Sequence, residues 1–145
     1  MPELRFQDWL DRVERTFFED DFEGYAAACA LPLTIVTRTA TNVVADRDDL
    51  RAGFDAWRDM LRSHGVTDMV RTARDVEQLG DGLIVGRYDT RLLAGSQLIL
   101  PPFASSMALK LEDGAWKAAL VSSGIGNSEF PITKPHLSAE APDGA

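Results

Sequence analysis

The fold is decided by two short stretches in the second half of the chain, Leu79-Gly80-Asp81-Gly82-Leu83 and Glu112-Asp113-Gly114-Ala115-Trp116. Each stretch holds an Asp-Gly pair between two runs that have the composition of long β-strands. Asp and Gly tolerate the positive φ that tight hairpin turns require. The two stretches therefore predict two antiparallel hairpins. Their strands are expected at residues 66–79, 83–93, 103–112 and 115–125.

The first half of the chain is predicted to be mostly helical. Apolar residues recur at helical spacing over residues 3–20, and a shorter, alanine-rich helix is expected over residues 22–30. Asp46 is a suitable N-cap for a third helix, which Gly65 would end. The Thr- and Val-rich residues 33–45 before it predict a small hairpin. We therefore predict an α+β fold, with three N-terminal helices packed in the concave face of a curved antiparallel sheet.

The length and composition restrict the possible functions. The 145 residues fit one domain, expected over residues 1–130, with residues 131–145 as a flexible C-terminal tail. The formal net charge of -8 and the absence of a Lys/Arg cluster argue against nucleic acid as a partner. No stretch of the sequence resembles a signal peptide or a membrane span, so we expect no membrane contact and a cytoplasmic location.

The sequence offers few residues that could bind a metal. Cys29 is the only cysteine, and its alanine-rich surroundings predict a buried hydrophobic side chain. His64 and His136 are the only histidines, and neither has a second ligand at metal-binding spacing. We therefore expect no metal site and no cofactor.

The predicted order of elements resembles the α+β cone of the nuclear-transport-factor-2-like (NTF2-like) superfamily, over nearly the whole chain. More locally, residues 98–102 (Leu-Ile-Leu-Pro-Pro) and residues 112–117 (Glu-Asp-Gly-Ala-Trp-Lys) look like the rim and the last turn of SnoaL-like members. The resemblance implies a pocket enclosed by the sheet and the helices, and commonly a homodimer formed across the outer sheet faces. The superfamily includes isomerases, cyclases, dehydratases and non-catalytic binding modules, so the fold alone does not fix the function.

Strand alternation, counted from the two Asp-Gly turns, predicts which side chains face the pocket. Arg87, Asp89, Arg91 and Lys117 are expected to point outward. The expected lining is apolar with a few hydroxyl groups, which suits a small, mostly apolar molecule bearing one or two oxygens. The predicted ligand-binding residues are Tyr25, Tyr88, Thr90, Ser105, Met107, Trp116 and Ser122.

Two further functions stay open at this level. In an enzyme, an inward Asp75 would act as the base next to a carbonyl group, and Tyr88 or Tyr25 would donate a hydrogen bond to the developing oxyanion. However, the alternation does not fix whether Arg74 or Asp75 points inward. Many relatives carry histidines on the last strand, where this chain has Leu120-Val121-Ser122-Ser123. Alternatively, the outer sheet face would bind another protein without catalysis.

Overall fold

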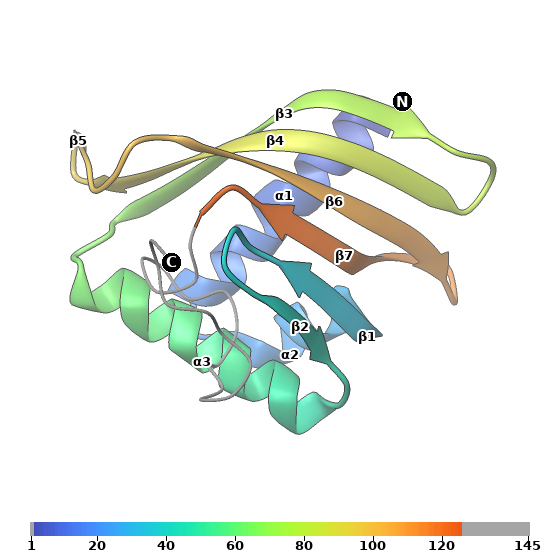
Figure 1. Ribbon diagram of the computed structural model, residues 1–145, viewed down its shortest axis with the longest axis horizontal. Helices are drawn as coiled ribbons and strands as arrows, with labels where there is room; N and C mark the ends of the chain where they lie inside the picture. Colours follow the sequence, from blue (N-terminus) through green and yellow to red (C-terminus); the bar gives the residue numbers. More distant parts are fainter. Residues whose placement is uncertain (1, 126–145) are drawn as a thin grey trace.

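The computed structural model describes residues 2–125, in which three helices cover one side of a curved sheet (Figure 1). The helices are α1 (Pro2–Phe18), α2 (Phe22–Ala27) and α3 (Arg47–Ser63). The strands are β1 (Cys29–Val36), β2 (Thr41–Val44), β3 (Asp68–Gln78), β4 (Leu83–Ala94), β5 (Gln97–Leu98), β6 (Phe103–Glu112) and β7 (Ala115–Ser123). The predicted tail at residues 131–145 lies outside the described residues.

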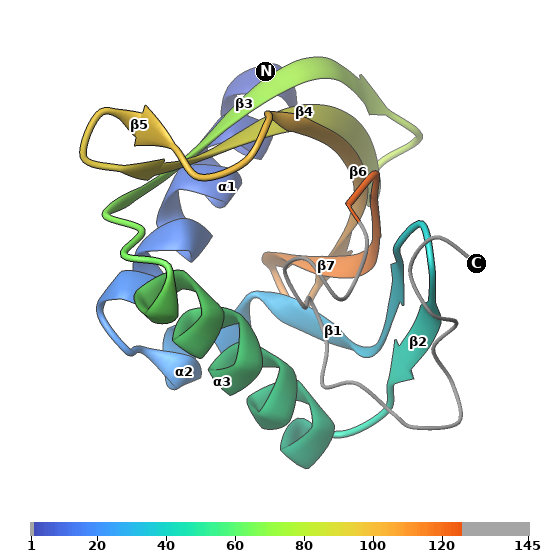
Figure 2. The same ribbon diagram turned by 60° about the vertical axis from the view of Figure 1, so that its left-hand side comes forward.

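The described strands form one sheet in the order β2-β1-β7-β6-β4-β3, with the short β5 paired to β4. Figure 2 shows the sheet curling through a broad arc, with the helices on its concave side. The α+β cone is therefore confirmed. One detail differs from the prediction, because β1 runs parallel to β7 while the other pairs are antiparallel. Within residues 2–125, no helix is long and apolar enough to cross a bilayer.

The α3 helix begins after its predicted N-cap and ends before Gly65, whereas α2 ends three residues earlier than predicted because Cys29 and Ala30 belong to β1. The Asp46 carboxylate accepts a hydrogen bond from the Asp49 backbone N–H (2.9 Å), and Asp21 does the same for the Gly24 N–H at the start of α2 (3.0 Å). Gly65 follows α3 with a φ of 68°, a conformation that glycine adopts without steric cost. These local signals position α2 and α3 across the open side of the sheet.

The two Asp-Gly stretches form different turns. Asp113 and Gly114 both have positive φ (52° and 79°), which is the conformation of a two-residue type I′ hairpin. In the other hairpin, Gly80 takes the positive φ (75°), and the Leu79 N–H bonds to the Leu83 carbonyl across a wider loop. Both predicted hairpins are present, but only the hairpin at Asp113-Gly114 has the predicted tight turn.

Two strands contain bulges that break the regular alternation of side chains. In β3 the register shifts between Ala73 and Val76, so that Arg74 and Asp75 together oppose Arg87. In β7 the register shifts at Ala119, because Ala118 pairs with Leu109 while Leu120 pairs with Ala108. Each bulge moves the residues beyond it to the opposite face of the sheet. The bulges therefore decide which side chains line the concave face.

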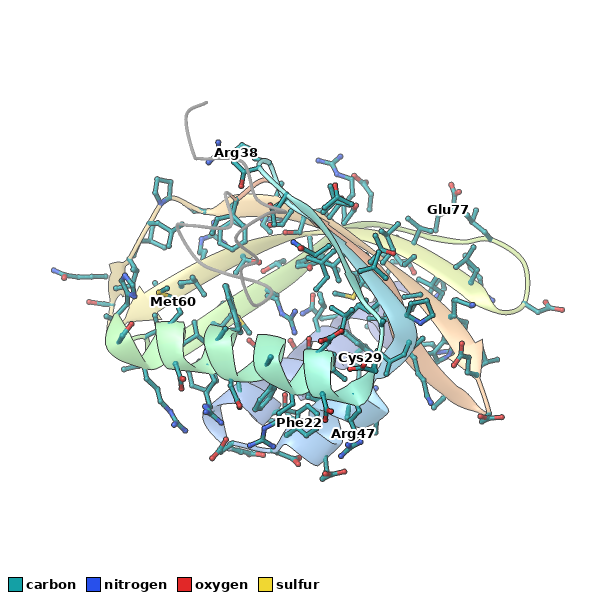
Figure 3. The ribbon with its side chains drawn as sticks, turned by 60° about the horizontal axis from the view of Figure 1, so that its bottom comes forward. Phe22, Cys29, Arg38, Arg47, Met60 and Glu77 are labelled. Atoms are coloured by element: carbon teal, nitrogen blue, oxygen red, sulfur yellow. The ribbon has the colours of Figure 1, made fainter. Side chains whose placement is uncertain are left out.

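The core lies between α1 and the concave face of the sheet. Phe6 and Leu10 of α1 are fully buried, as are Ile84 of β4 and Leu109 of β6. A Cβ atom on Gly86 would lie 2.6 Å from the Phe6 ring, so this strand position requires glycine for the helix to pack this closely. Phe22 of α2 packs against Phe54 of α3 (5.5 Å between ring centroids), and the guanidinium of Arg47 lies over the Phe22 ring at 4.9 Å (Figure 3).

Candidate functional site

A cavity of about 90 Å³ lies between the helices and the concave face of the sheet. Its wall is mostly aliphatic and aromatic, with polar groups from Arg71, two tyrosines, Thr90, two serines and Cys29. The helices contribute Trp9, Val13, Phe17, Tyr25, Gly53 and Trp57. The strands contribute Cys29, Leu33, Ile35, Met69, Arg71, Tyr88, Thr90, Phe103, Ser105, Met107, Ala118, Val121 and Ser123.

Five of the predicted ligand-binding residues line this cavity. They are Tyr25, Tyr88, Thr90, Ser105 and Met107. Four of these come from β4 and β6, whose alternation is regular, and only Tyr25 comes from a helix. Counting from the Asp-Gly turns therefore predicted correctly which face of β4 and β6 borders the cavity. Contact of these residues with a ligand stays a prediction.

Two predicted residues lie elsewhere. Ser122 lies on the outer face, where its hydroxyl is 2.8 Å from that of Ser106, because the β7 bulge reverses the alternation after Ala118. Val121 and Ser123 take its place in the cavity wall. Trp116 precedes the bulge but packs against α1 instead, and its carbonyl accepts a hydrogen bond from the Trp9 indole N–H (3.1 Å). The placement of both residues in the pocket was therefore wrong.

The proposed catalytic base, Asp75, also lies outside the cavity. Its side chain is 78% exposed, and a carboxylate oxygen lies 3.5 Å from the Arg87 guanidinium on the outer face. The neighbouring Arg74 forms an ion pair with Asp89 on the same face (2.7 Å). Since the bulge in β3 directs both Arg74 and Asp75 outward, the hypothesis that Asp75 acts as a base in the pocket is wrong.

The same bulge turns Arg71 inward, a residue that the sequence did not single out. Arg71 is only 9% exposed and lines the cavity, with its guanidinium 5.8 Å from the centre of the Tyr88 ring. Its Nη2 donates a hydrogen bond to the Leu10 carbonyl (2.7 Å), while its Nε has no hydrogen-bond partner in the described part of the chain. No signal in the sequence predicts the bulge, and regular alternation would place Arg71 outside.

The phenols and the thiol of the cavity wall are neutral at physiological pH. Burial raises the pKa of Tyr88, although Arg71 and a hydrogen bond with Ser105 act in the opposite direction. Burial and the nearby Cys29 raise the pKa of Tyr25 well above its usual value. Burial also raises the pKa of Cys29 to about 12. These groups can donate hydrogen bonds to a ligand, while the thiol is a poor nucleophile.

The comparisons with known proteins agree with this architecture. The family model described as NTF2-like protein (DUF6841) matches residues 3–123. The chain belongs to this NTF2-like family. Among curated proteins, none matches the chain. The family therefore accounts for the cone and its cavity, while the resemblance to SnoaL-like members in particular stays a prediction.

Solved NTF2-like structures share the fold at low sequence identity. An NTF2-like protein of unknown function from Shewanella oneidensis MR-1 is 12% identical, with 86% of this chain and 100% of that chain covered and a TM-score of 0.67. A domain of unknown function with a cystatin-like fold from Nostoc punctiforme PCC 73102 is 12% identical, with 85% and 76% covered and a TM-score of 0.63. Aln2 from a Streptomyces species is 18% identical, with 86% and 91% covered and a TM-score of 0.63.

In this NTF2-like cone, the charge of Arg71 acts on the carboxyl group of Glu14 of α1. Glu14 lies in a separate groove between α1 and β3, which Asp11 and Arg15 also line. Burial is the main reason why the pKa of Glu14 rises to about 7, and the neighbouring Asp11 raises it further, while Arg71 and Arg15 lower it.

Within residues 2–125, no cluster of His, Cys, Asp or Glu could hold a metal ion.

Proposed function

We propose that this NTF2-like protein binds a small, mostly apolar molecule with one or two oxygens in its cavity. The observation that carries the proposal is the cavity itself, whose wall is apolar except for a few buried polar groups. Such a wall is typical of ligand sites, where the apolar surface supplies affinity and a few polar groups fix the orientation. The predicted lining residues Tyr88, Thr90 and Ser105 supply hydroxyl groups.

The volume limits the size of the ligand. A cavity of roughly 150 Å³ holds benzene, so about 90 Å³ has room for about four non-hydrogen atoms. Met69 and Met107 border the cavity, and their flexible side chains can adjust to a slightly larger molecule. The proposed ligand is therefore much smaller than a steroid or a polyketide.

We assign binding rather than proton abstraction to this site. Among residues 2–125, no Asp, Glu or His lines the cavity, so the described residues offer no general base there. The isomerase, cyclase or dehydratase activity that the resemblance to SnoaL-like members suggested is therefore not part of the proposal.

Xenon tests the cavity without requiring knowledge of the natural ligand, because it enters apolar cavities and forms no hydrogen bonds. We expect xenon to bind the wild-type protein, as seen by ¹²⁹Xe NMR. The Ala118→Leu variant should lose this binding, since three added carbon atoms fill roughly 75 Å³ on the scale set by benzene. Ala115→Leu is the matched control, because Ala115 lies on the same strand but is exposed. Exclusion of xenon from the wild-type protein, or its retention in Ala118→Leu, would contradict the proposal.

We also propose that two copies pair through the outer face of the sheet. Ala104, Ser106 and Ala108 of β6 have small side chains there, and the neighbouring Leu120 is 41% exposed. A low apolar strip of this kind permits close approach of a second sheet. The ion pairs of Arg74 and Arg87 lie beside this strip.

Analytical ultracentrifugation tests the pairing. The wild-type protein should sediment as a dimer and Ala108→Arg as a monomer, because the new charge would be buried without a partner. Leu4→Arg is the control, since Leu4 is 71% exposed on α1. A monomeric wild-type protein would instead favour the alternative function, in which the outer face binds a different protein.

A further inference from the structure

Within residues 2–125, Arg71 is a buried cation without a counter-charge. Its side chain is more than nine-tenths buried, and one of its N–H groups bonds to the Leu10 carbonyl. Among the described residues, no carboxylate lies within ion-pair distance of its guanidinium, and its Nε has no hydrogen-bond partner. A guanidinium stays protonated in proteins, so the positive charge cannot be removed by loss of a proton.

Such an arrangement destabilises the protein unless something compensates for the charge. Buried charges in proteins are normally paired, because the loss of hydration is costly. Most of the wall around Arg71 is aliphatic or aromatic, and although the Tyr88 ring and hydroxyl interact with the guanidinium, they carry no negative charge. A neutral oxygen would satisfy the free N–H, but only an anion would also neutralise the charge.

We infer that the ligand of the cavity is a short-chain monocarboxylate, whose carboxylate pairs with Arg71 and whose hydrocarbon part contacts the apolar wall. This inference rests on the proposed binding function and names the chemical class of its ligand. The planar guanidinium offers several N–H donors in a geometry that matches a carboxylate.

The surroundings of Arg71 favour a carboxylate over a larger anion. Arg71 is the one charged residue in the cavity wall formed by residues 2–125, so its charge would balance a ligand with a single negative charge. A phosphate would bring more charge and more oxygens than one guanidinium can compensate. The Tyr88 hydroxyl, which interacts with both Arg71 and Ser105, is a donor for the ligand's oxygens. A volume of about 90 Å³ fits the four non-hydrogen atoms of acetate, and movement of the flexible Met69 and Met107 side chains would admit propionate or butyrate.

Glu14 does not serve as the missing counter-ion. It lines the groove between α1 and β3 and not the cavity, and its Oε2 is itself buried without a hydrogen-bond partner among residues 2–125. The Glu14 carboxyl and the Arg71 guanidinium therefore influence each other without forming a direct ion pair. The charge of Arg71 remains available to a ligand that enters the cavity.

The direct test compares acids with neutral molecules of the same shape. Two-dimensional ¹H–¹⁵N NMR titrations of the wild-type protein would use acetate, propionate and butyrate, each paired with its amide, together with 1-butanol as a neutral apolar probe. We expect each acid to bind at least tenfold more tightly than its amide, because a hydrogen bond to a charged group is much stronger than one to a neutral group. The resonances that shift should include those of Tyr88 and Ser105.

Variants then assign the preference to Arg71. Arg71→Met keeps the length of the side chain but removes the charge, and it should bind butyrate no better than butyramide while still admitting xenon. Arg71→Lys keeps the charge without the planar fork and should retain part of the preference for the acid. Arg74→Met is the matched control, since this arginine lies on the same strand but on the outer face. It should bind butyrate like the wild-type protein.

The outcomes separate this inference from the proposed function. If xenon or 1-butanol binds but acids and amides bind equally, the assignment of a carboxylate is overturned and the binding function stands. If Arg71→Met folds and keeps the preference for acids, the role of Arg71 is overturned. If neither xenon nor any of the organic probes binds the wild-type protein, both proposals fail.

Discussion

Replacing Glu14 with glutamine should make the protein more stable at high pH and leave it almost unchanged at low pH. Glu14 is half-buried in the groove between α1 and β3, where burial and the nearby Asp11 raise its pKa from 4.5 to about 7. In the unfolded chain the carboxyl returns to its ordinary pKa. Below about pH 4.5 it is protonated in both states. Above pH 7 the folded protein must hold the charge in an unfavourable place, so stability falls as the pH rises through this window.

The size of the effect follows from the pKa. A change from 4.5 to about 7 corresponds to about 3 kcal/mol for a fully buried group. Because Glu14 is half exposed, solvent screens the interaction, and we expect about 1 to 2 kcal/mol. The amide of Glu14→Gln carries no charge and can still donate a hydrogen bond to Asp11, as the protonated carboxyl does. The substitution therefore removes the penalty without removing the contact.

Urea denaturation at pH 5.0 and pH 8.0 measures this directly. The free energy of unfolding of Glu14→Gln should exceed that of the wild-type protein by about 1 to 2 kcal/mol at pH 8.0, as worked out above, and by much less at pH 5.0. Glu77→Gln is the control, because Glu77 lies exposed on β3 and extends away from the helices (Figure 3). It should show little difference at either pH. An advantage of Glu14→Gln that is equal at both pH values, or a loss of stability at pH 8.0, would refute the reasoning.

Three other substitutions probe the fold by urea denaturation at pH 7. Gly86→Ala should lower the free energy of unfolding by about 1 to 3 kcal/mol, because its Cβ would lie 2.6 Å from the Phe6 ring, and no change would mean that Phe6 moves freely. Asp46→Ala should cost about 1 kcal/mol through loss of the α3 N-cap, and Asp46→Asn should restore most of it. Arg71→Met should leave the free energy of unfolding unchanged or raise it by about 1 to 4 kcal/mol, since an uncompensated buried charge is removed, whereas a large loss of stability would indicate a structural role.

Most of the fold could be predicted from the sequence because its signals are local. The Asp46 side chain caps α3 through the Asp49 N–H, three residues away, and Asp113-Gly114 forms its turn from its own backbone preferences. Such interactions depend on residues within one turn of the chain, so the sequence alone contains them. The parallel pairing of β1 with β7 joins distant parts of the chain, so no local sequence pattern predicts it.

The site could be predicted only where the strands are regular. Tyr88 and Ser105 face each other across β4 and β6, and counting from the turns placed both correctly. The prediction of Ser122 was wrong because Ala119 bulges out of β7, and a shift of one residue reverses every later side chain. A bulge is fixed by how the sheet bends over the helices, which is a property of the whole fold and not of the residues around Ala119.

The bulge in β3 has the larger consequence, because it changes which charged side chain faces the cavity. With regular pairing, Arg74 would face inward and Arg71 outward, while the extra residue sends Arg74 and Asp75 out together and brings Arg71 beneath α1. Gln7 of α1 holds this stretch in place, since its amide bonds to the Arg71 carbonyl (2.7 Å) and the Ala73 N–H (2.8 Å) on the open edge of the strand. The Gln7 hydrogen bonds, which cover the open edge of β3, thus also hold the strand in the register that buries Arg71. The cavity wall therefore holds a guanidinium and, among residues 2–125, no carboxylate.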